Sequence, residues 1–391
     1  MRILFSGNPH VGHLLPMMPL ADAGRAAGHE TAMMTSADLA SLVAPMRVLR
    51  TGPSVEEMVD ETLRRTGSHP SQPVPETMEL FGGVRVELNF VEALRAVEFY
   101  AGLRVELSFD EALRQARAFG PDLMVCEEYD FVGPIVAAAL GVPWAAHAIM
   151  GPLPEPFWQA MQERLACEYK SRSLTATPRI AFVDPYPDAL RSPAEKSPAD
   201  RITIRPAVNE YGPARHAEPD LEPEHPCALV TLGTTVNDSV ALSALTSSVA
   251  AAGFTTIVTA QREDLSADID QDRVRPVGFV PLAKLLPQVD LVVTAGGSGT
   301  VLASLSCGLP MVIRPFFADH PWNAARLAYR GAAIVIGDVA EAGTAARRIA
   351  ENPAYREVAE RVAAELASLN SPDTVLRRLT SALASYRHGT F

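Results

Sequence analysis

The sequence predicts an α/β protein made of two doubly wound, Rossmann-like domains. Three observations carry this prediction. The chain has 391 residues, which is more than one hydrophobic core usually serves. Short apolar runs alternate with helical segments in both halves, as in a parallel sheet covered by helices. A proline-rich stretch separates the two halves, so we expect one parallel sheet on each side of it.

The first half begins with a strand, a helix and a second strand. The run "ILFS" is followed by a loop, by apolar residues at helical spacing in "LLPMMPLADAGRAA", and by the strand "ETAMMTS". The segments "PDLMVCEE", "FVGPIVAAAL" and "WAAHAIM" repeat this order. Glycines and prolines interrupt the long uncharged stretch 131–154, which favours a buried helix and strand over a membrane span. The predicted first domain covers residues 1–210.

The second half repeats the pattern and is predicted to form a domain over residues 221–370. Its expected strands lie in "CALVTLGTT", "TTIVTAQ", "LVVTAGG", "MVIRP" and "AAIVIG". Residues 178–226 hold ten of the 32 prolines and are interpreted as a linker without long helices or central strands. Two helices close the chain. The second helix, within residues 371–391, begins with Ser-Pro-Asp, a helix start signal. This helix could cross back to the first domain.

One internal repeat occurs in the first half. "RVELNFVEALRA" begins at Arg85 and "RVELSFDEALRQ" begins at Arg104. A single pair of repeats is too few for a solenoid. We interpret the pair as two similar amphipathic helical segments. A mobile helical flap over a ligand site is the alternative.

Charge and cysteine content exclude several classes of protein. The formal net charge of -12 argues against a broad basic face for nucleic acid. The four cysteines lack metal-like spacing, which fits reduced thiols in a cytosol and indicates no metal site. The N-terminal apolar run is too short for a signal peptide. We therefore expect a cytoplasmic protein with neither nucleic-acid nor membrane partners.

A glycine-rich loop follows a predicted strand of the second half. "TAGGSGT", residues 294–300, lies between "LVV" and the helical segment "VLASLSC". Free amides and the helix dipole at such a place favour an anion, and the hydroxyls of Ser298 and Thr300 can add donors. A diphosphate would fit, although a tight turn without ligand explains the glycines equally well. The loop matches neither a dinucleotide fingerprint nor a Walker loop.

Polar side chains also follow the next strand of the second half. "MVIRPFFADHPWNAARL" places Asp319 and His320 before a helix, at the strand end where open α/β sheets usually bind ligands. These residues could bind sugar hydroxyls. Alternatively, Asp319 caps the helix.

The first loop of the chain carries two histidines. "GNPHVGHLLP" places His10 and His13 after the first strand, where a neutral imidazole could accept a proton from a hydroxyl. An orienting carboxylate could come from Glu127, Glu128 or Asp130, after the strand "PDLMVC". A structural role for His13 remains the alternative.

Together these segments resemble a known family. "GHLLPMMPLADAGRAAGHE", "PDLMV", "TLGTT", "GFVPLAKLLPQVD" and "GGSGTVLASLSCGLPMVIRPFFADHPWNAARL" occur in the order found in two-domain GT-B glycosyltransferases of actinobacterial natural-product pathways. The resemblance spans nearly the whole chain. It implies two Rossmann-like domains facing across a cleft. The first domain would bind the acceptor and the second a dTDP-deoxysugar.

The resemblance also implies roles for individual residues. It makes His13 the general base, with His10 as second choice, and Glu127 its orienting acid where relatives more often have aspartate. The implied donor-site residues are Thr234, Phe279, Val280, Gly296, Gly297, Ser298, Gly299, Thr300, Asp319 and His320. Phe279 and Val280 would border the nucleobase. Relatives have histidine at the position of Ala295 and glutamine at that of His320, so an unusual donor sugar is one hypothesis.

The function implied is that of an inverting, metal-independent glycosyltransferase. It would move a hexose-type deoxysugar from a dTDP-sugar to a hydroxyl of an enediyne, macrolide or aromatic polyketide, forming an O-glycoside without any cofactor. Methionines and aromatic residues could line the apolar acceptor pocket, namely Met33, Phe81, Phe90, Phe99, Tyr100, Phe157 and Trp158. The sequence leaves a homodimer open.

Two other functions compete with this one. A non-catalytic, nucleotide-sugar-binding helper subunit is favoured by Ala295 and by Glu127 in place of aspartate. A nucleotide-dependent oxidoreductase is the second. It lacks a GxGxxG motif after the first strand and an acidic ribose partner.

Overall fold

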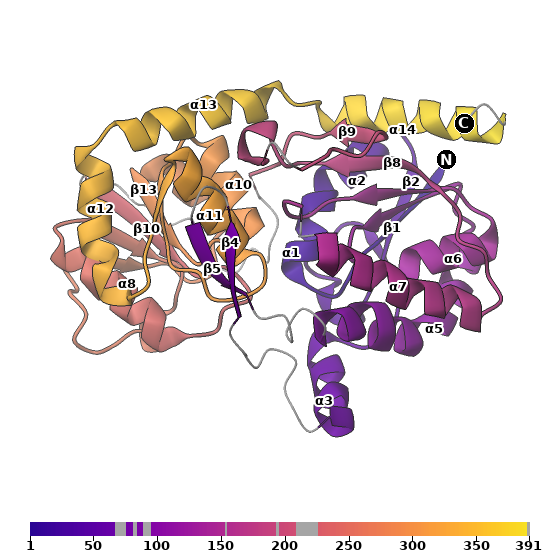
Figure 1. The fold of residues 1–391 in the computed structure, drawn as a ribbon, viewed down its shortest axis with the longest axis horizontal. Helices are drawn as coiled ribbons and strands as arrows, with labels where there is room; N and C mark the ends of the chain where they lie inside the picture. The colour runs from indigo at the N-terminus through magenta and orange to yellow at the C-terminus, as the bar shows by residue number, and fades with distance from the viewer. Residues whose placement is uncertain are drawn as a thin grey trace.

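Two parallel sheets with helices on their faces form the two halves of the molecule (Figure 1). The computed structural model describes residues 1–66, 76–80, 84–88, 95–152, 155–192, 195–208 and 226–388. The α/β prediction is confirmed. Phe81, Phe90, most of the first repeat after Leu88, and residues 209–225 of the proline-rich stretch lie outside the described residues.

The first sheet has seven parallel strands. Their spatial order is β3 (Arg47–Arg50), β2 (Glu30–Thr35), β1 (Arg2–Ser6), β6 (Leu123–Glu127), β7 (Trp144–His147), β8 (Arg179–Asp184) and β9 (Arg201–Thr203). The helices of this half are α1 (Val11–Leu14), α2 (Met18–Ala26), α3 (Val55–Thr66), α5 (Arg104–Phe119), α6 (Val132–Leu140) and α7 (Glu155–Ser171).

The second sheet has six parallel strands. Their order is β12 (Val274–Pro276), β11 (Thr255–Val258), β10 (Cys227–Thr231), β13 (Leu291–Thr294), β14 (Met311–Ile313) and β15 (Ala333–Val335). The helices that follow in sequence are α8 (Ser239–Ala251), α9 (Leu282–Leu285), α10 (Ser298–Ser306), α11 (His320–Arg330), α12 (Ala342–Glu351), α13 (Ala354–Ser368) and α14 (Pro372–Arg387).

Both sheets reverse their strand order once, and these reversals position the site. In the first sheet β1 pairs with both β2 and β6, so the chain continues on one side and then on the other. In the second sheet β10 lies between β11 and β13. Loops that leave the carboxyl ends of the two central strands diverge there and form the usual ligand crevice of doubly wound sheets.

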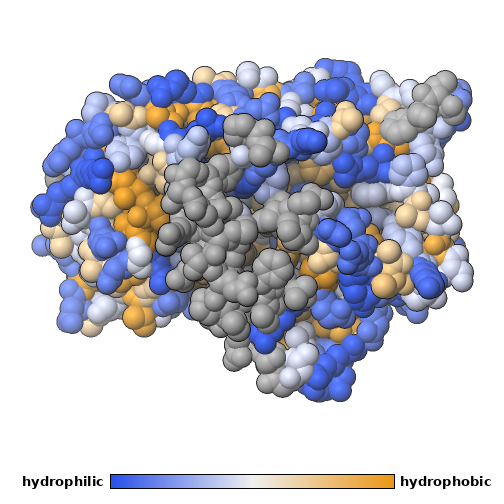
Figure 2. Space-filling model, viewed as in Figure 1, coloured by the Kyte–Doolittle hydropathy of each residue, from blue (hydrophilic) through white to orange (hydrophobic). Residues whose placement is uncertain are grey.

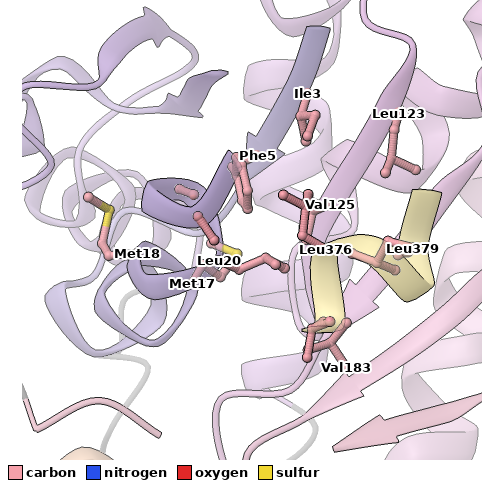
Figure 3. Packing of buried hydrophobic residues seen from close by; sticks show 14 of the residues in the cluster. Ile3, Phe5, Met17, Met18, Leu20, Leu123, Val125, Val183, Leu376 and Leu379 are labelled. Atoms are coloured by element: carbon pink, nitrogen blue, oxygen red, sulfur yellow. The ribbon is translucent and has the colours of Figure 1, made fainter. Parts of the chain in front are cut away.

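Both faces of the first sheet are buried, because successive side chains of its strands enter different cores. Ile3 and Phe5 of β1 pack in the core beneath α2, whereas Leu4 packs in the core beneath α5 and α6. Figure 3 shows the first of these cores, in which Leu376 and Leu379 of α14 lie beside Val125. The C-terminal helix therefore packs on the N-terminal half.

The start of α14 matches its sequence signal. The hydroxyl of Ser371 accepts a hydrogen bond from the amide of Thr374 at 3.3 Å, and Pro372 occupies the first helical position. A proline there loses no helical hydrogen bond. The predicted helix is confirmed, while the domain boundaries themselves stay a prediction.

Two expectations about secondary structure are wrong. The proline-rich stretch does contain a central strand, β8, which lies between β7 and β9. Its residues 179–184 fall between Pro178 and Pro185, so no proline interrupts its ladder. In the repeat, the second copy forms the helix α5, whereas the described start of the first copy is a strand. The first begins in β5 (Val84–Leu88), which pairs antiparallel with β4 (Glu76–Leu80) beside α11 (Figure 1).

The face of the molecule drawn in Figure 2 is mostly polar where it is described. Hydrophilic side chains cover much of the described surface in Figure 2, with smaller hydrophobic areas between them. Among the described residues, no helix combines the length and the apolar composition that crossing a membrane requires.

Candidate active site

His13 and Glu127 meet at the strand reversal of the first sheet. His13 lies on α1, directly after β1, and Glu127 is the last residue of β6, the neighbour of β1. The Nδ1 atom of His13 is 2.9 Å from Oε2 of Glu127. This is one of the pairings considered from the sequence, which also left Glu128 and Asp130 open as partners.

The carboxylate of Glu127 is buried and held by two further donors. Its residue is 1% exposed. Oε2 also accepts from Nδ2 of Asn8 at 3.0 Å, and Oε1 accepts from the amide of Tyr129 at 2.6 Å. A carboxylate only accepts hydrogen bonds, so Nδ1 of His13 carries the proton and Nε2 keeps a free lone pair. The pair has the chemistry of a general base with an orienting acid.

The other titratable groups of this region are arranged differently. His10 is the N-cap residue of α1, and its ring centre is 5.0 Å from that of His13. Burial, and secondarily the nearby His13 and Arg104, lowers the pKa of His10 to about 3. Asp130 accepts from the Ser6 hydroxyl and from the amide of Val132 at 3.1 Å. Asp130 therefore secures the start of α6 and does not contact His13.

The Glu128 carboxyl has a raised pKa, which makes the stability of the protein depend on pH. Burial is the main cause that raises its pKa to about 8, and the carboxylates of Asp184 and Glu127 add to the shift. A carboxyl with a raised pKa in the folded state stabilises the fold only while it is protonated. Its contribution is complete below the usual pKa near 4.5 and is lost as the pH rises through about 8.

Glu128→Gln should therefore stabilise the protein in alkaline solution only. Near pH 4.5 the variant and the wild type should have similar free energies of unfolding. The difference should grow as the pH rises above 4.5 and level off above pH 8, at up to about 5 kcal/mol in favour of glutamine, because each pH unit between the two pKa values is worth about 1.4 kcal/mol. Urea unfolding at pH 5, 7 and 9 measures it. Equal stability of both proteins at pH 9 would show that the partly buried Glu128 carboxylate does not destabilise the fold when it is ionised.

The glycine loop lies at the reversal of the second sheet, between β13 and α10. Gly296 has a φ of 96°, and a Cβ there would lie 2.8 Å from Cγ2 of Ile313, so this position requires glycine. At Gly299 a Cβ would meet nothing within 4 Å, so the start of α10 is open. The amides of Gly299 and Thr300 have no partner within the helix. This arrangement can bind an anion.

Asp319 and Ser298 contact each other. Oδ2 of Asp319 accepts from the Ser298 amide at 2.8 Å and from its hydroxyl at 2.6 Å. Nδ2 of Asn323 donates to the same Oδ2 at 2.8 Å, to the Ser298 hydroxyl at 3.0 Å, and to the carbonyl of Gly296 at 2.9 Å. Asp319 is the N-cap residue of α11 without a capping side-chain bond. It therefore ties α11 to α10.

His320 lies beside the glycine loop. The residue is 5% exposed, and its Nε2 atom is 3.5 Å from the position that a Cβ of Gly297 would occupy. Its Nδ1 accepts from the amide of Phe317 at 3.4 Å, and the two rings lie 5.2 Å apart. Burial lowers the pKa of His320, so the ring is neutral near pH 7 with its proton on Nε2. No described residue accepts that proton.

The remaining predicted donor-site residues occupy three different surroundings. Thr234 is exposed in the loop after β10, and the hydroxyl of Thr300 lies 4.0 Å from a Cβ position at the adjacent Gly233. Phe279 is 43% exposed, which leaves its ring available for stacking. Val280 packs in the core of the second half, so its side chain is occupied there.

The two halves are joined close to the glycine loop by contacts of α11. Arg326 of α11 donates to Glu195 at 2.5 Å and to the carbonyl of Pro152 at 2.7 Å. The hydroxyl of Tyr186 donates to Oδ1 of Asn323 at 3.2 Å. Burial is the main cause that raises the pKa of Tyr129, and the carboxylates of Glu128, Glu127 and Asp319 add to the shift.

Comparisons with known proteins show the family of this chain. The C-terminal domain of erythromycin biosynthesis protein CIII-like proteins matches residues 243–382. The elloramycin glycosyltransferase of Streptomyces olivaceus is 30% identical over 391 residues, which cover 98% of this chain and 97% of the relative. The chain belongs to the antibiotic glycosyltransferases.

Other members of this family agree in sequence and in fold. The L-demethylnoviosyl transferase of Streptomyces niveus is 30% identical over 97% of this glycosyltransferase and 98% of the relative. The glycosyltransferase SsfS6 of Streptomyces sp. SF2575, complexed with thymidine diphosphate, is 29% identical with a TM-score of 0.79. That comparison covers 97% of this chain and 99% of SsfS6. The GT-B fold is confirmed, and the protein is a glycosyltransferase of a natural-product pathway.

Sequence reasoning missed two residues of the candidate site, Asn8 and Asn323, and gave Tyr100 only as one of several residues that could line an acceptor pocket. Asn8 orients Glu127, Asn323 organises the glycine loop, and Tyr100 contacts both histidines. Asn8 and Asn323 stand beside the predicted site in "GNPH" and "HPWNAARL", where a polar side chain next to a strand-end loop was the available signal. No local signal distinguishes Tyr100. Among the described residues, no group of three acidic, histidine or cysteine side chains could hold a metal ion.

Proposed function

We propose that this glycosyltransferase inverts the anomeric centre of a dTDP-sugar and transfers the sugar to a hydroxyl of a hydrophobic secondary metabolite. The observation that carries the proposal is the His13–Glu127 contact of 2.9 Å at one strand reversal, combined with an open glycine loop at the other. Binding of thymidine diphosphate by the similar SsfS6 supports the choice of nucleotide.

The proposed reaction is a single displacement. The acceptor oxygen attacks the anomeric carbon from the face opposite the diphosphate. The bond between that carbon and the phosphate oxygen breaks, and dTDP leaves with its electron pair. The acceptor proton passes to Nε2 of His13, and Glu127 stabilises the imidazolium through its Nδ1 proton. Attack from the opposite face inverts the configuration, and the product is an O-glycoside.

In this proposal the leaving diphosphate binds at the start of α10. The amides of Gly299 and Thr300 and the helix dipole offer positive potential there. Nε2 of His320 adds a side-chain donor next to Gly297. These donors can stabilise the leaving group without a metal ion, so we propose metal-independent transfer. For the acceptor, partly buried aromatic residues near the first-half core, including Phe157 and Trp158, support an apolar ligand.

Calorimetric titration with dTDP, with and without EDTA, tests the donor site. We expect micromolar binding that EDTA does not change, and turnover when dTDP-sugars are screened against polyketide aglycones. Binding without turnover of any pair would favour a helper subunit over the proposed enzyme. Absence of dTDP binding by the folded protein would overturn the donor assignment.

His320→Ala should weaken the binding of dTDP. Loss of a hydrogen bond to a charged phosphate costs about 1.5 to 3 kcal/mol, which corresponds to a ten- to hundredfold rise in the dissociation constant. His29→Ala is the matched control, because His29 contacts the N-terminal amine at 3.3 Å and lies away from the glycine loop. If both variants bind dTDP like the wild type, His320 does not contact the diphosphate.

A further inference from the structure

Tyr100 lies against the two histidines of the first loop and has no role in the reaction described above. Its ring centre is 5.8 Å from that of His13, with 28° between the ring planes, so the two rings are stacked. Its hydroxyl is 3.1 Å from Nε2 of His10. We name Tyr100, His10 and His13 the ring cluster.

The backbone that presents Tyr100 is unusual. Glu98–Leu103 form a π-helical turn directly before α5, and such wide turns often occur at functional sites. Phe99 and Leu103 of this turn are buried and pack with Met58 of α3. The turn is therefore anchored on one side by this small core. On its other side, the turn places the ring of Tyr100 against His10 and His13 of the first loop.

The hydrogen bond between Tyr100 and His10 joins two uncharged groups. The lowered pKa of His10, about 3, keeps its imidazole neutral. Burial raises the pKa of the Tyr100 phenol, which keeps its proton. The phenol can donate to a neutral imidazole nitrogen. This bond fixes the plane of the Tyr100 ring against His13.

The Tyr100 ring lies close enough to His13 to interact with a positive charge on its imidazole. The face of an aromatic ring carries negative partial charge and attracts a cation within about 6 Å of its centre. Glu127 acts in the same direction through Nδ1. His10 is neutral and does not compete for the proton. Farther out, Arg104 contributes a positive charge that reaches His10, and Asp130 lies close enough to Arg104 to interact with it.

We propose that Tyr100 is a positioning residue of the transfer reaction, that it holds the His13 ring against Glu127 and stabilises its imidazolium, and that His10 acts by anchoring the Tyr100 hydroxyl. The proposal rests on His13 being the general base. In this proposal His10 anchors the Tyr100 hydroxyl and does not act as the general base, the role for which the sequence made it the second choice.

Nuclear magnetic resonance of protein labelled at histidine Cε1 tests the proposal without a known acceptor. The His13 signal is assigned by its loss in His13→Gln, and its pH midpoint is compared among variants. Tyr100→Leu removes the ring and should lower the midpoint by about 0.5 to 1, because the charged form loses a stabilising contact. Tyr100→Phe keeps the ring and should lower it less. Tyr355→Leu, in the core of the second half, is the matched control and should change nothing.

A double-mutant cycle tests the anchoring by His10. Tyr100→Phe and His10→Leu each break the same hydrogen bond. The change in the His13 pH midpoint in the double variant should therefore equal the change in either single variant, and not the sum of the two changes. With a dTDP-sugar that the enzyme turns over, Tyr100→Leu should lower kcat about tenfold and leave the KM for the donor unchanged.

The outcomes separate this proposal from the proposed function. A wild-type midpoint in Tyr100→Leu would overturn the positioning role, and additive effects in the cycle would overturn the anchoring by His10. The third outcome is a lowered His13 midpoint in Tyr100→Leu together with a wild-type protein that turns over no dTDP-sugar. It would support the contact between Tyr100 and His13 and refute the proposed function.

Discussion

Replacement of His13 by alanine should lower kcat about a thousandfold and leave the affinity for dTDP within twofold of the wild type. General-base catalysis contributes about 10²- to 10⁴-fold, and His13 is the group whose Nε2 is free while Nδ1 is held by Glu127 at 2.9 Å. The His13 side chain is only 16% exposed and donates to a buried carboxylate, so its loss should also lower the free energy of unfolding by about 1 to 3 kcal/mol. Release of dTDP from a dTDP-sugar and calorimetry with dTDP measure the two quantities.

Glu127→Gln should lower kcat about a hundredfold, again with unchanged dTDP binding. The amide has a single acceptor oxygen, whereas the carboxylate accepts from Asn8, from the Tyr129 amide and from His13. One of these donors would meet an NH₂ group, and the His13 ring would lose its orienting charge. His29→Ala serves as the control for both variants. Wild-type turnover by His13→Ala would refute His13 as the base.

Asn323→Asp should strongly lower both the free energy of unfolding and the affinity for dTDP. Nδ2 of Asn323 donates to three acceptors, and one of them is the carboxylate of Asp319 at 2.8 Å. The substitution keeps the shape but puts a second carboxylate against Asp319 and against the carbonyl of Gly296. A buried like-charge contact with unsatisfied acceptors should cost about 3 to 5 kcal/mol of folding free energy. The glycine loop should lose its geometry.

Calorimetry and urea unfolding test this expectation. Binding of dTDP by Asn323→Asp should fall at least a hundredfold, and the midpoint of unfolding should decrease. Asn370→Asp is the matched control, because Nδ2 of Asn370 donates to the carbonyl of Thr203 at 3.0 Å, away from the glycine loop. It should lower stability without changing dTDP binding. If Asn323→Asp bound dTDP normally, Asn323 would not organise the donor site.

Local patterns predicted most strands and the chemistry of their loops. Apolar runs with glycine-rich or polar ends identified β1, β6, β10 and β13, because a strand buried on both faces is apolar throughout. Parallel strands end on one edge of a sheet, so His13 and Glu127 were foreseeable as partners. The short strands β3, β9 and β12 were missed, since three or four residues carry little pattern.

The contacts of polar side chains could not be predicted in the same way. The sequence allowed Asp319 to cap α11 or to bind a sugar, and in the structure it accepts from Ser298 on α10. Tyr100 is far from His10 along the chain, and only the packing of the π-helical turn brings their atoms to 3.1 Å. Such contacts depend on how separate elements pack, which no local pattern records.

The tetrapeptide "RVEL" separates what the sequence determined from what the tertiary structure decided. The sequence determined most of the longer strands and the glycine loop, because backbone preferences and burial of apolar runs act over a few neighbouring residues. The same four residues are extended in β5 and helical in α5, where Arg104 donates to the carbonyl of Thr51 at 3.1 Å. Intrinsic preferences of a short segment are worth less than the contacts it makes, so β4 and the core beneath α5 decided these two conformations.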